Sequence, residues 1–112
     1  MEAPLVSDAG RLEKLRALVS AAPGDARARY FLANELFRAG DWAGAAEHFE
    51  AYVALGPGDE GAALRSLGLC LERLDRVDAA RDAYRRGIEV ALQHHHDGLA
   101  SEIRFLLEAL DD

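Results

Sequence analysis

Residues 32–49 read LANELFRAGDWAGAAEHF, and residues 67–84 read LGLCLERLDRVDAARDAY. The two stretches match at small and apolar positions 35 residues apart, which pair Leu32 with Leu67, Ala33 with Gly68, Leu36 with Leu71, Ala45 with Ala80 and Phe49 with Tyr84. Within each stretch, apolar residues recur three or four positions apart, a spacing that predicts two helices joined by a turn at Gly40-Asp41 or Asp75-Arg76. A helical hairpin repeated at a fixed interval of this size predicts a solenoid of stacked hairpins.

The rest of the chain divides at similar breaks. They lie at Pro23-Gly24-Asp25, at residues 56–59 and at His96-Asp97-Gly98. Glycine tolerates the left-handed backbone that follows a helix, and an aspartate at each break is expected to cap the next helix. Ser7 is the expected cap of the first helix. The pattern predicts six helices and no strands.

These residues resemble the tetratricopeptide repeat family, whose unit of about 34 residues carries a Leu-Gly pair, then Ala-x-x-x-Phe, then a closing proline. The first unit here reads Leu32-Ala33-x-x-Leu36, Ala45-x-x-x-Phe49 and Pro57, and the second reads Leu67-Gly68-x-x-Leu71 and Ala80-x-x-x-Tyr84. The resemblance implies an all-α, right-handed solenoid of about six helices in one domain. Its parts are a half repeat at 7–22, full repeats at 25–56 and 59–92, and a capping helix at 97–110.

The two end segments are expected to cover the apolar ends of the stack, because each repeat buries one face on its neighbour. The first segment carries the apolar residues Leu12, Leu15, Leu18 and Val19. In the last segment, the residues expected to face inward are Leu99, Ile103, Leu106 and Leu110. Glu102, Arg104 and Glu108 are expected to face outward.

Length and composition narrow the class of protein. A chain of 112 residues, half of them hydrophobic and 29% charged, fits one globular domain. The net charge of −7 argues against a nucleic-acid partner. We expect no membrane partner and no export signal, because no apolar run is long enough to span a bilayer and the start lacks a basic segment before an apolar one.

Other compositional signs point to a compartment and a source. Cys70 is the single cysteine, which fits a reducing cytoplasm. Threonine is absent and Lys14 is the single lysine, while alanine, arginine and leucine abound, a bias that suits helices and a GC-rich bacterial genome.

Three neighbouring histidines, His94, His95 and His96, form the most conspicuous local feature. Consecutive helical side chains point about 100° apart, so three in a row do not converge on one metal ion. We interpret them as a helix end where imidazole complements the negative dipole, followed by a turn at Asp97-Gly98. A metal- or ligand-responsive regulator that uses this cluster is the alternative, and no cofactor is expected.

Catalytic patterns are missing from the sequence. It contains no glycine-rich phosphate loop, no Gly-x-Ser-x-Gly and no His-Glu-x-x-His. We interpret Cys70 as a small buried thiol and His48 as a boundary histidine, and we expect no enzyme.

The resemblance implies instead a concave groove, lined by the first helix of each hairpin, that binds a segment of another protein. Helical geometry assigns to this groove Arg27, Tyr30, Asn34, Phe37 and Arg38 from the first repeat and Arg65, Leu69, Glu72 and Arg73 from the second. Four arginines against one glutamate reverse the sign of the whole chain, and guanidinium groups suit carboxylates. We therefore expect an acidic or amphipathic peptide as partner. A chaperone for a secreted or assembly subunit is the alternative, and a homo-oligomer stays open.

Overall fold

The computed structural model describes residues 8–56, 59 and 61–111, and in these ranges every regular element is a helix. The helices are α1 (Asp8–Ala21), α2 (Ala26–Arg38), α3 (Trp42–Leu55), α4 (Ala62–Arg73), α5 (Val77–Gln93) and α6 (Asp97–Ala109). Ser7 and Pro57, the expected first cap and the expected closing proline, lie outside the described residues. None of the described helices is long and apolar enough to cross a membrane.

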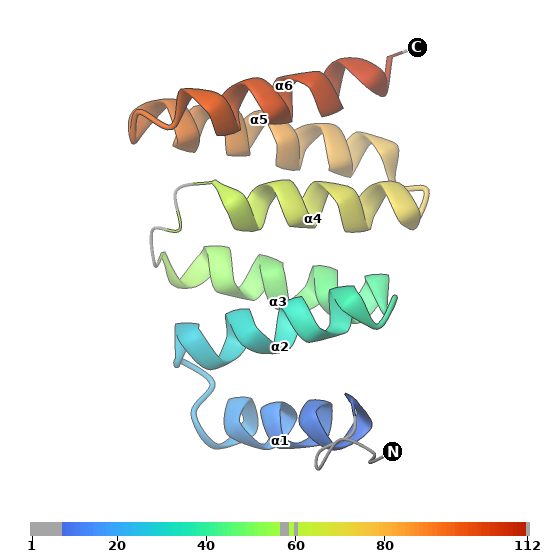
Figure 1. Ribbon diagram of the computed structural model, residues 1–112, viewed down its shortest axis with the longest axis vertical. Helices are drawn as coiled ribbons and strands as arrows, with labels where there is room; N and C mark the ends of the chain where they lie inside the picture. The colour runs from blue at the N-terminus through green and yellow to red at the C-terminus, as the bar shows by residue number, and fades with distance from the viewer. Residues whose placement is uncertain (1–7, 57–58, 60, 112) are drawn as a thin grey trace, which may run out of the picture.

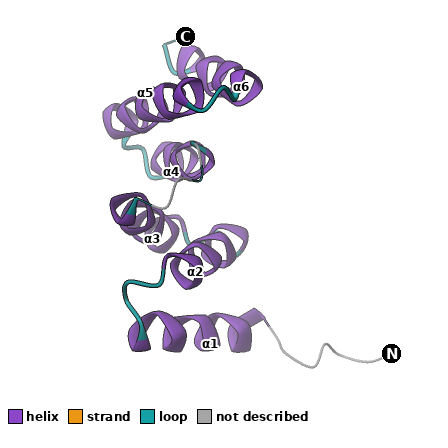
Figure 2. Ribbon diagram, turned by 90° about the vertical axis from the view of Figure 1, so that its left-hand side faces the viewer, coloured by secondary structure: helices purple, strands orange, loops and turns teal. Residues whose placement is uncertain are grey.

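The helices stack in chain order along the longest axis of the molecule (Figure 1), whose extents are 43 × 28 × 26 Å. Each helix packs against the next one in sequence. From the side, α2, α4 and α6 form one layer and α3 and α5 the other, with α4 set back between α2 and α6 (Figure 2). We call the layer of α2, α4 and α6 the concave side.

The repeated small and aromatic residues form the core. Ala45 and Phe49 of the first hairpin are fully buried, and so are Ala80 and Tyr84 of the second. Alanine lets the helix backbones approach closely, and the aromatic ring fills the space between two turns of the neighbouring helix. The all-α helical solenoid expected from the repeat pattern is confirmed.

The three short turns between helices share one geometry. Gly40, Asp75 and His95 adopt positive φ angles of 81°, 59° and 61°. The next N–H in each turn reaches back five residues, where Asp41 donates to the Leu36 carbonyl at 2.9 Å, Arg76 to Leu71 at 2.9 Å and His96 to Ala91 at 2.8 Å. This left-handed residue followed by a long backward hydrogen bond is the Schellman type of helix end.

The expected aspartate caps are correct at some breaks and wrong at others. Asp25 and Asp41 cap α2 and α3, since their side chains accept from backbone N–H groups at 2.9–3.3 Å. Asp75 instead adopts the left-handed backbone, and Asp97 lies inside the first turn of α6. Arg76 and His96 take the two cap positions without a side-chain hydrogen bond to the helix.

The end helices cover the stack unequally. Ile103 of α6 is fully buried, and its apolar neighbours Leu99, Leu106 and Leu110 are half-buried. In α1, Val19 is buried and Leu12 and Leu15 are half-buried against the core, whereas Leu18 is 56% exposed.

Candidate interaction surface

The residues predicted to line the groove lie on α2 and α4, but they differ in how open they are. Arg27, Arg38 and Arg73 are exposed. The other six are half-buried, namely Tyr30, Asn34, Phe37, Arg65, Leu69 and Glu72. On this part of the concave side, the three guanidinium groups are therefore the groove side chains most accessible to a partner.

The rings of Tyr30 and Phe37 pack against aromatic rings of α3. The Tyr30 ring lies 4.6 Å from the Tyr52 ring, and Phe37 meets Trp42 edge to face at 5.3 Å, both measured between centroids. Both rings also meet Phe49 edge to face, at 6.2 and 6.4 Å. Both rings are thus half-buried against α3, which leaves part of each side chain open to a partner.

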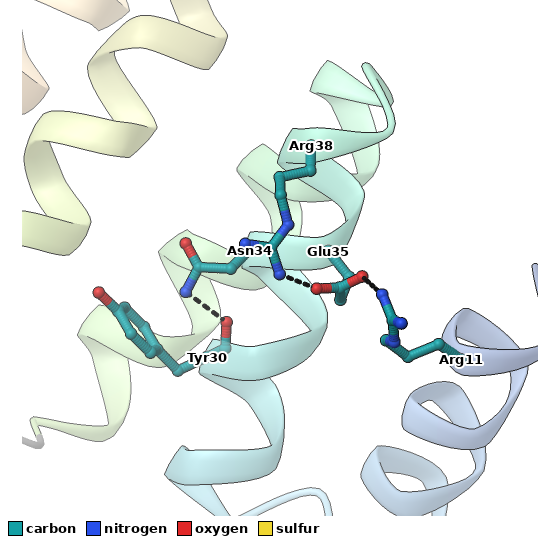
Figure 3. A network of polar contacts seen from close by, with 5 residues as sticks. All are labelled: Arg11, Tyr30, Asn34, Glu35 and Arg38. Atoms are coloured by element: carbon teal, nitrogen blue, oxygen red, sulfur yellow. Dashed lines mark hydrogen bonds and ion pairs between the residues drawn. The ribbon is translucent and has the colours of Figure 1, made fainter. Parts of the chain in front are cut away.

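A polar network joins α1 to the surface (Figure 3). Glu35 is buried, and its carboxylate accepts from Arg11 of α1 at 3.1 Å and from Arg38 one turn along α2. These hydrogen bonds, Arg38 first and Arg11 second, hold the pKa of Glu35 below its ordinary value against the opposing effect of burial. The side chain of Asn34 turns back to donate to the Tyr30 carbonyl at 3.0 Å.

The second repeat fixes its polar residues in other ways. Glu72 accepts a hydrogen bond from the buried Tyr84 hydroxyl, and Arg65 pairs with Glu102 of α6 at 3.0 Å. The Arg73 guanidinium lies over the Trp42 ring, 4.9 Å from its centroid, in a cation–π contact between α4 and α3. Glu35, Glu72 and Glu102 are thus each held by a donor of this protein.

Two of the predicted groove arginines keep their charge uncompensated. Within the described residues, neither Arg27 nor Arg73 has a carboxylate within ion-pair distance. Arg38 offers only one nitrogen to Glu35, and its side chain is 71% exposed, so its other donors remain open to a ligand. Three guanidinium groups, those of Arg27, Arg38 and Arg73, are therefore exposed on the predicted groove of a protein of charge −7.

A cleft of about 820 Å³ opens at the start of α2. Its lining residues are Gly24, Asp25, Ala26, Arg27, Tyr30, Phe31 and Tyr52. Phe31 and Tyr52 are not among the residues that the sequence predicts to line the groove. Phe31 could have been found, because it lies four residues after Arg27 and seven before Arg38, which is the spacing of one helical face.

The three neighbouring histidines and Cys70 lie at helix ends and in the core. His94 is the C-cap of α5, His95 adopts the left-handed backbone and His96 is the N-cap of α6. The expected helix end is therefore present, while Asp97-Gly98 is helix instead of turn. Among the described residues, no three His, Cys, Asp or Glu side chains gather as they would around a metal ion. Cys70 is buried, which raises the pKa of its thiol to about 11.

His48 is half-buried and contacts an arginine. The Nη1 of Arg29 lies 3.1 Å from His48 Nδ1, and Arg29 also donates to the Pro23 carbonyl at 3.0 Å. Burial first and the Arg29 charge second lower the pKa of His48. An arginine only donates, so His48 Nδ1 accepts and the ring is neutral.

Comparison with known proteins agrees with this architecture. A family model described as tetratricopeptide repeat matches residues 12–60 and 59–92, which together cover more than half of the chain. No curated protein matches it. Repeats of this kind generally mediate binding between proteins, typically on a non-enzymatic scaffold. With two matched segments, six stacked helices and the repeated core residues, the chain belongs to the tetratricopeptide repeat family.

Proposed function

We propose that this protein is a non-catalytic cytoplasmic interaction module whose concave side binds an acidic segment of another protein. The binding residues are those of α2 and α4, with Arg38 and Arg73 as the central pair. These two arginines occupy corresponding positions 35 residues apart, near the ends of two parallel first helices (Figure 1).

The observation that carries this proposal is the uncompensated positive charge of the surface. Each nearby glutamate accepts from a donor of the protein itself, whereas Arg27 and Arg73 have no carboxylate partner in the described part of the chain. A ligand carboxylate would meet exposed guanidinium groups with free donors. Glu35 and Glu102 are paired with arginines, while Glu72, bonded to the neutral Tyr84 hydroxyl, keeps its charge beside Arg73. Such a surface speeds the encounter with an acidic partner and rejects a basic one.

A non-catalytic role is supported by the state of the candidate nucleophile. A thiol whose pKa lies near 11 is almost entirely protonated at neutral pH, and Cys70 is also buried within α4. The thiolate is the reactive form of cysteine. Cys70 therefore contributes to core packing and is not a nucleophile.

Affinity for the native partner tests the proposal. A pull-down from the source organism with mass spectrometry identifies the partner, and titration calorimetry then compares variants. Combining Arg38→Gln with Arg73→Glu should weaken binding at least tenfold, about 1.4 kcal/mol. Glutamine at position 38 keeps a donor for the buried Glu35, which protects the fold.

Arg16→Gln combined with Arg85→Glu is the matched control. Both arginines are exposed, they lie on α1 and α5, and the total change of charge is the same. The control should bind within twofold of the wild type. Equal weakening by the two pairs would mean that overall charge, and not this surface, determines binding.

A further inference from the structure

The cleft at the start of α2 lies at the opposite end of the concave side from the arginine pair. Arg27, which lines the cleft, precedes Arg38 by eleven residues of continuous helix. At 1.5 Å per residue this is about 16 Å along the axis. An extended peptide covers that distance with about five residues.

The walls of the cleft are largely aromatic. The rings of Tyr30 and Tyr52 lie 4.6 Å apart and form one side, while Phe31 stands 52% exposed beside them. Tyr30 and Tyr52 are packed against α2 and α3 and hold a fixed position, so a ligand would not have to order them. Rigid aromatic side chains of this kind provide contact area at low entropic cost.

Arg27 is the cation that lines the cleft, and the two carboxylates near it, Asp25 and Asp59, are engaged by backbone N–H groups. The Asp25 side chain is occupied by the N–H groups of Arg27 and Ala28, at 3.0 and 3.3 Å. Asp59, whose charge is felt at Tyr52, is likewise occupied by two backbone N–H groups at the start of α4, at 2.6 and 3.2 Å. The Arg27 guanidinium is exposed and has no such partner among the described residues.

We propose that this cleft anchors the partner by taking one aromatic or large aliphatic side chain, with a carboxylate on the adjacent ligand residue bound to Arg27. The inference rests on the proposed function, since the same ligand runs along the concave side. The 16 Å between the two ends sets the ligand pattern: an apolar-acidic pair, about four spacer residues, then the carboxylates that meet Arg38 and Arg73. Phe31 and Tyr52 are then specificity-determining residues.

Synthetic peptides test the pattern without knowledge of the native partner. The probe is a fluorescein-labelled decapeptide with Phe-Glu near one end and Glu-Glu near the other, separated by four alanine or serine residues and made in both chain directions. Two comparison peptides replace the phenylalanine by alanine or all glutamates by glutamine. In fluorescence anisotropy, the better direction of the probe should bind at least tenfold more tightly than either comparison peptide.

Variants of the protein locate the effect. Phe31→Ser and Arg27→Gln should each weaken the probe at least fivefold. Phe105→Ser is the matched control, because Phe105 is 71% exposed on α6 and the substitution is the same. It should bind within twofold of the wild type. In the wild type, the amide NMR signals of Gly24 and Ala26 should shift with the phenylalanine peptide and not with its alanine counterpart, a readout that needs no variant.

The contrary outcomes separate the two proposals. If the alanine peptide binds as tightly as the probe and both depend on Arg38 and Arg73, the anchor is refuted and the proposed function stands. If Phe31→Ser weakens the binding of the probe but Arg38→Gln with Arg73→Glu leaves its affinity unchanged, the anchoring cleft stands and the proposed arginine surface is refuted. Absence of saturable binding up to about 1 mM, or equal loss in Phe105→Ser, overturns the anchor.

Discussion

Gly68 is the residue at which the second repeat departs most clearly from the first. A Cβ at this position would lie 2.2 Å from Cε1 of Tyr84, although the backbone here is ordinary helix. The first repeat has alanine at the matching position, Ala33, and phenylalanine, Phe49, at the position that matches Tyr84. The difference follows from the Tyr84 hydroxyl, which bonds Glu72 and holds the ring against Gly68.

Gly68→Ala should therefore destabilise the protein, by about 1–3 kcal/mol from overpacking, even though alanine in a helix interior gains about 1 kcal/mol over glycine. Adding Tyr84→Phe should recover part of the lost stability. Without the hydrogen bond to Glu72, the ring at position 84 can shift to the place in its repeat that Phe49 takes in the first repeat. Urea unfolding of the two single variants and the double variant measures the coupling. A Gly68→Ala protein more stable than the wild type would contradict this packing.

The contact between His48 and Arg29 predicts a dependence of stability on pH. The neutral ring is favoured in the folded state, so its pKa there is below the value of about 6.5 found in unfolded chains. Unfolded chains take up the proton first, and stability should fall as pH drops below about 6.5. The urea midpoint at pH 5.5 against pH 7.5 measures this, and His48→Gln should flatten the difference. An unchanged midpoint in the wild type would refute the neutral assignment.

At the scale of the element, α2 differs from α4 in what lies on its outer flank. The position that holds buried Cys70 in α4 holds Glu35 in α2, and the partner there is Arg11 of α1. A buried carboxylate adds little net stability compared with an apolar residue, but it needs its partners. The attachment of α1 thus depends on an ion pair as well as on Val19.

Arg11→Ala should loosen α1 selectively. Arg11 is about half exposed and Arg38 still satisfies Glu35, so we expect a loss of about 1 kcal/mol. Hydrogen exchange should become roughly fivefold faster in the amides of α1 and remain unchanged in α5. Arg16→Ala, on the exposed face of the same helix, is the control. Equal exchange in the two variants would show that apolar contact alone holds α1.

The sequence predicted the helices and their core residues, but it did not predict which side of α2 packs against its neighbours. The four helices of the two hairpins and their core residues followed from the 35-residue interval, because packing of small residues against aromatic ones repeats with it. The two end helices followed from the breaks and the apolar spacing. The open strip of α2 did not follow. Ala28, Leu32 and Glu35 of this helix are buried. Tyr30 and Phe37 lie at the edge of the core, and Phe31 is exposed. Which flank of a helix meets its neighbour is decided by the stack and not by local periodicity.

At the scale of the whole molecule, stacking separates two kinds of surface. Helices α2, α4 and α6 form one layer of the stack, and α3 and α5 form the other (Figure 2). Glu35, Glu72 and Glu102, each held by a donor of the protein, lie on the first layer. The exposed arginines Arg27, Arg38 and Arg73 lie on α2 and α4 of the same layer.

An NMR titration of the isotope-labelled protein with an acidic peptide at two salt concentrations tests this central claim most directly. The probe is the Phe-Glu and Glu-Glu decapeptide described above. We predict that shifted amides cluster on α2 and α4, around Asn34, Arg38, Leu69 and Arg73, and that affinity falls at least tenfold between 50 and 500 mM salt, because exposed charges are screened within about 10 Å already at 0.1 M. Shifts confined to α3 and α5, or an affinity indifferent to salt, would contradict the account.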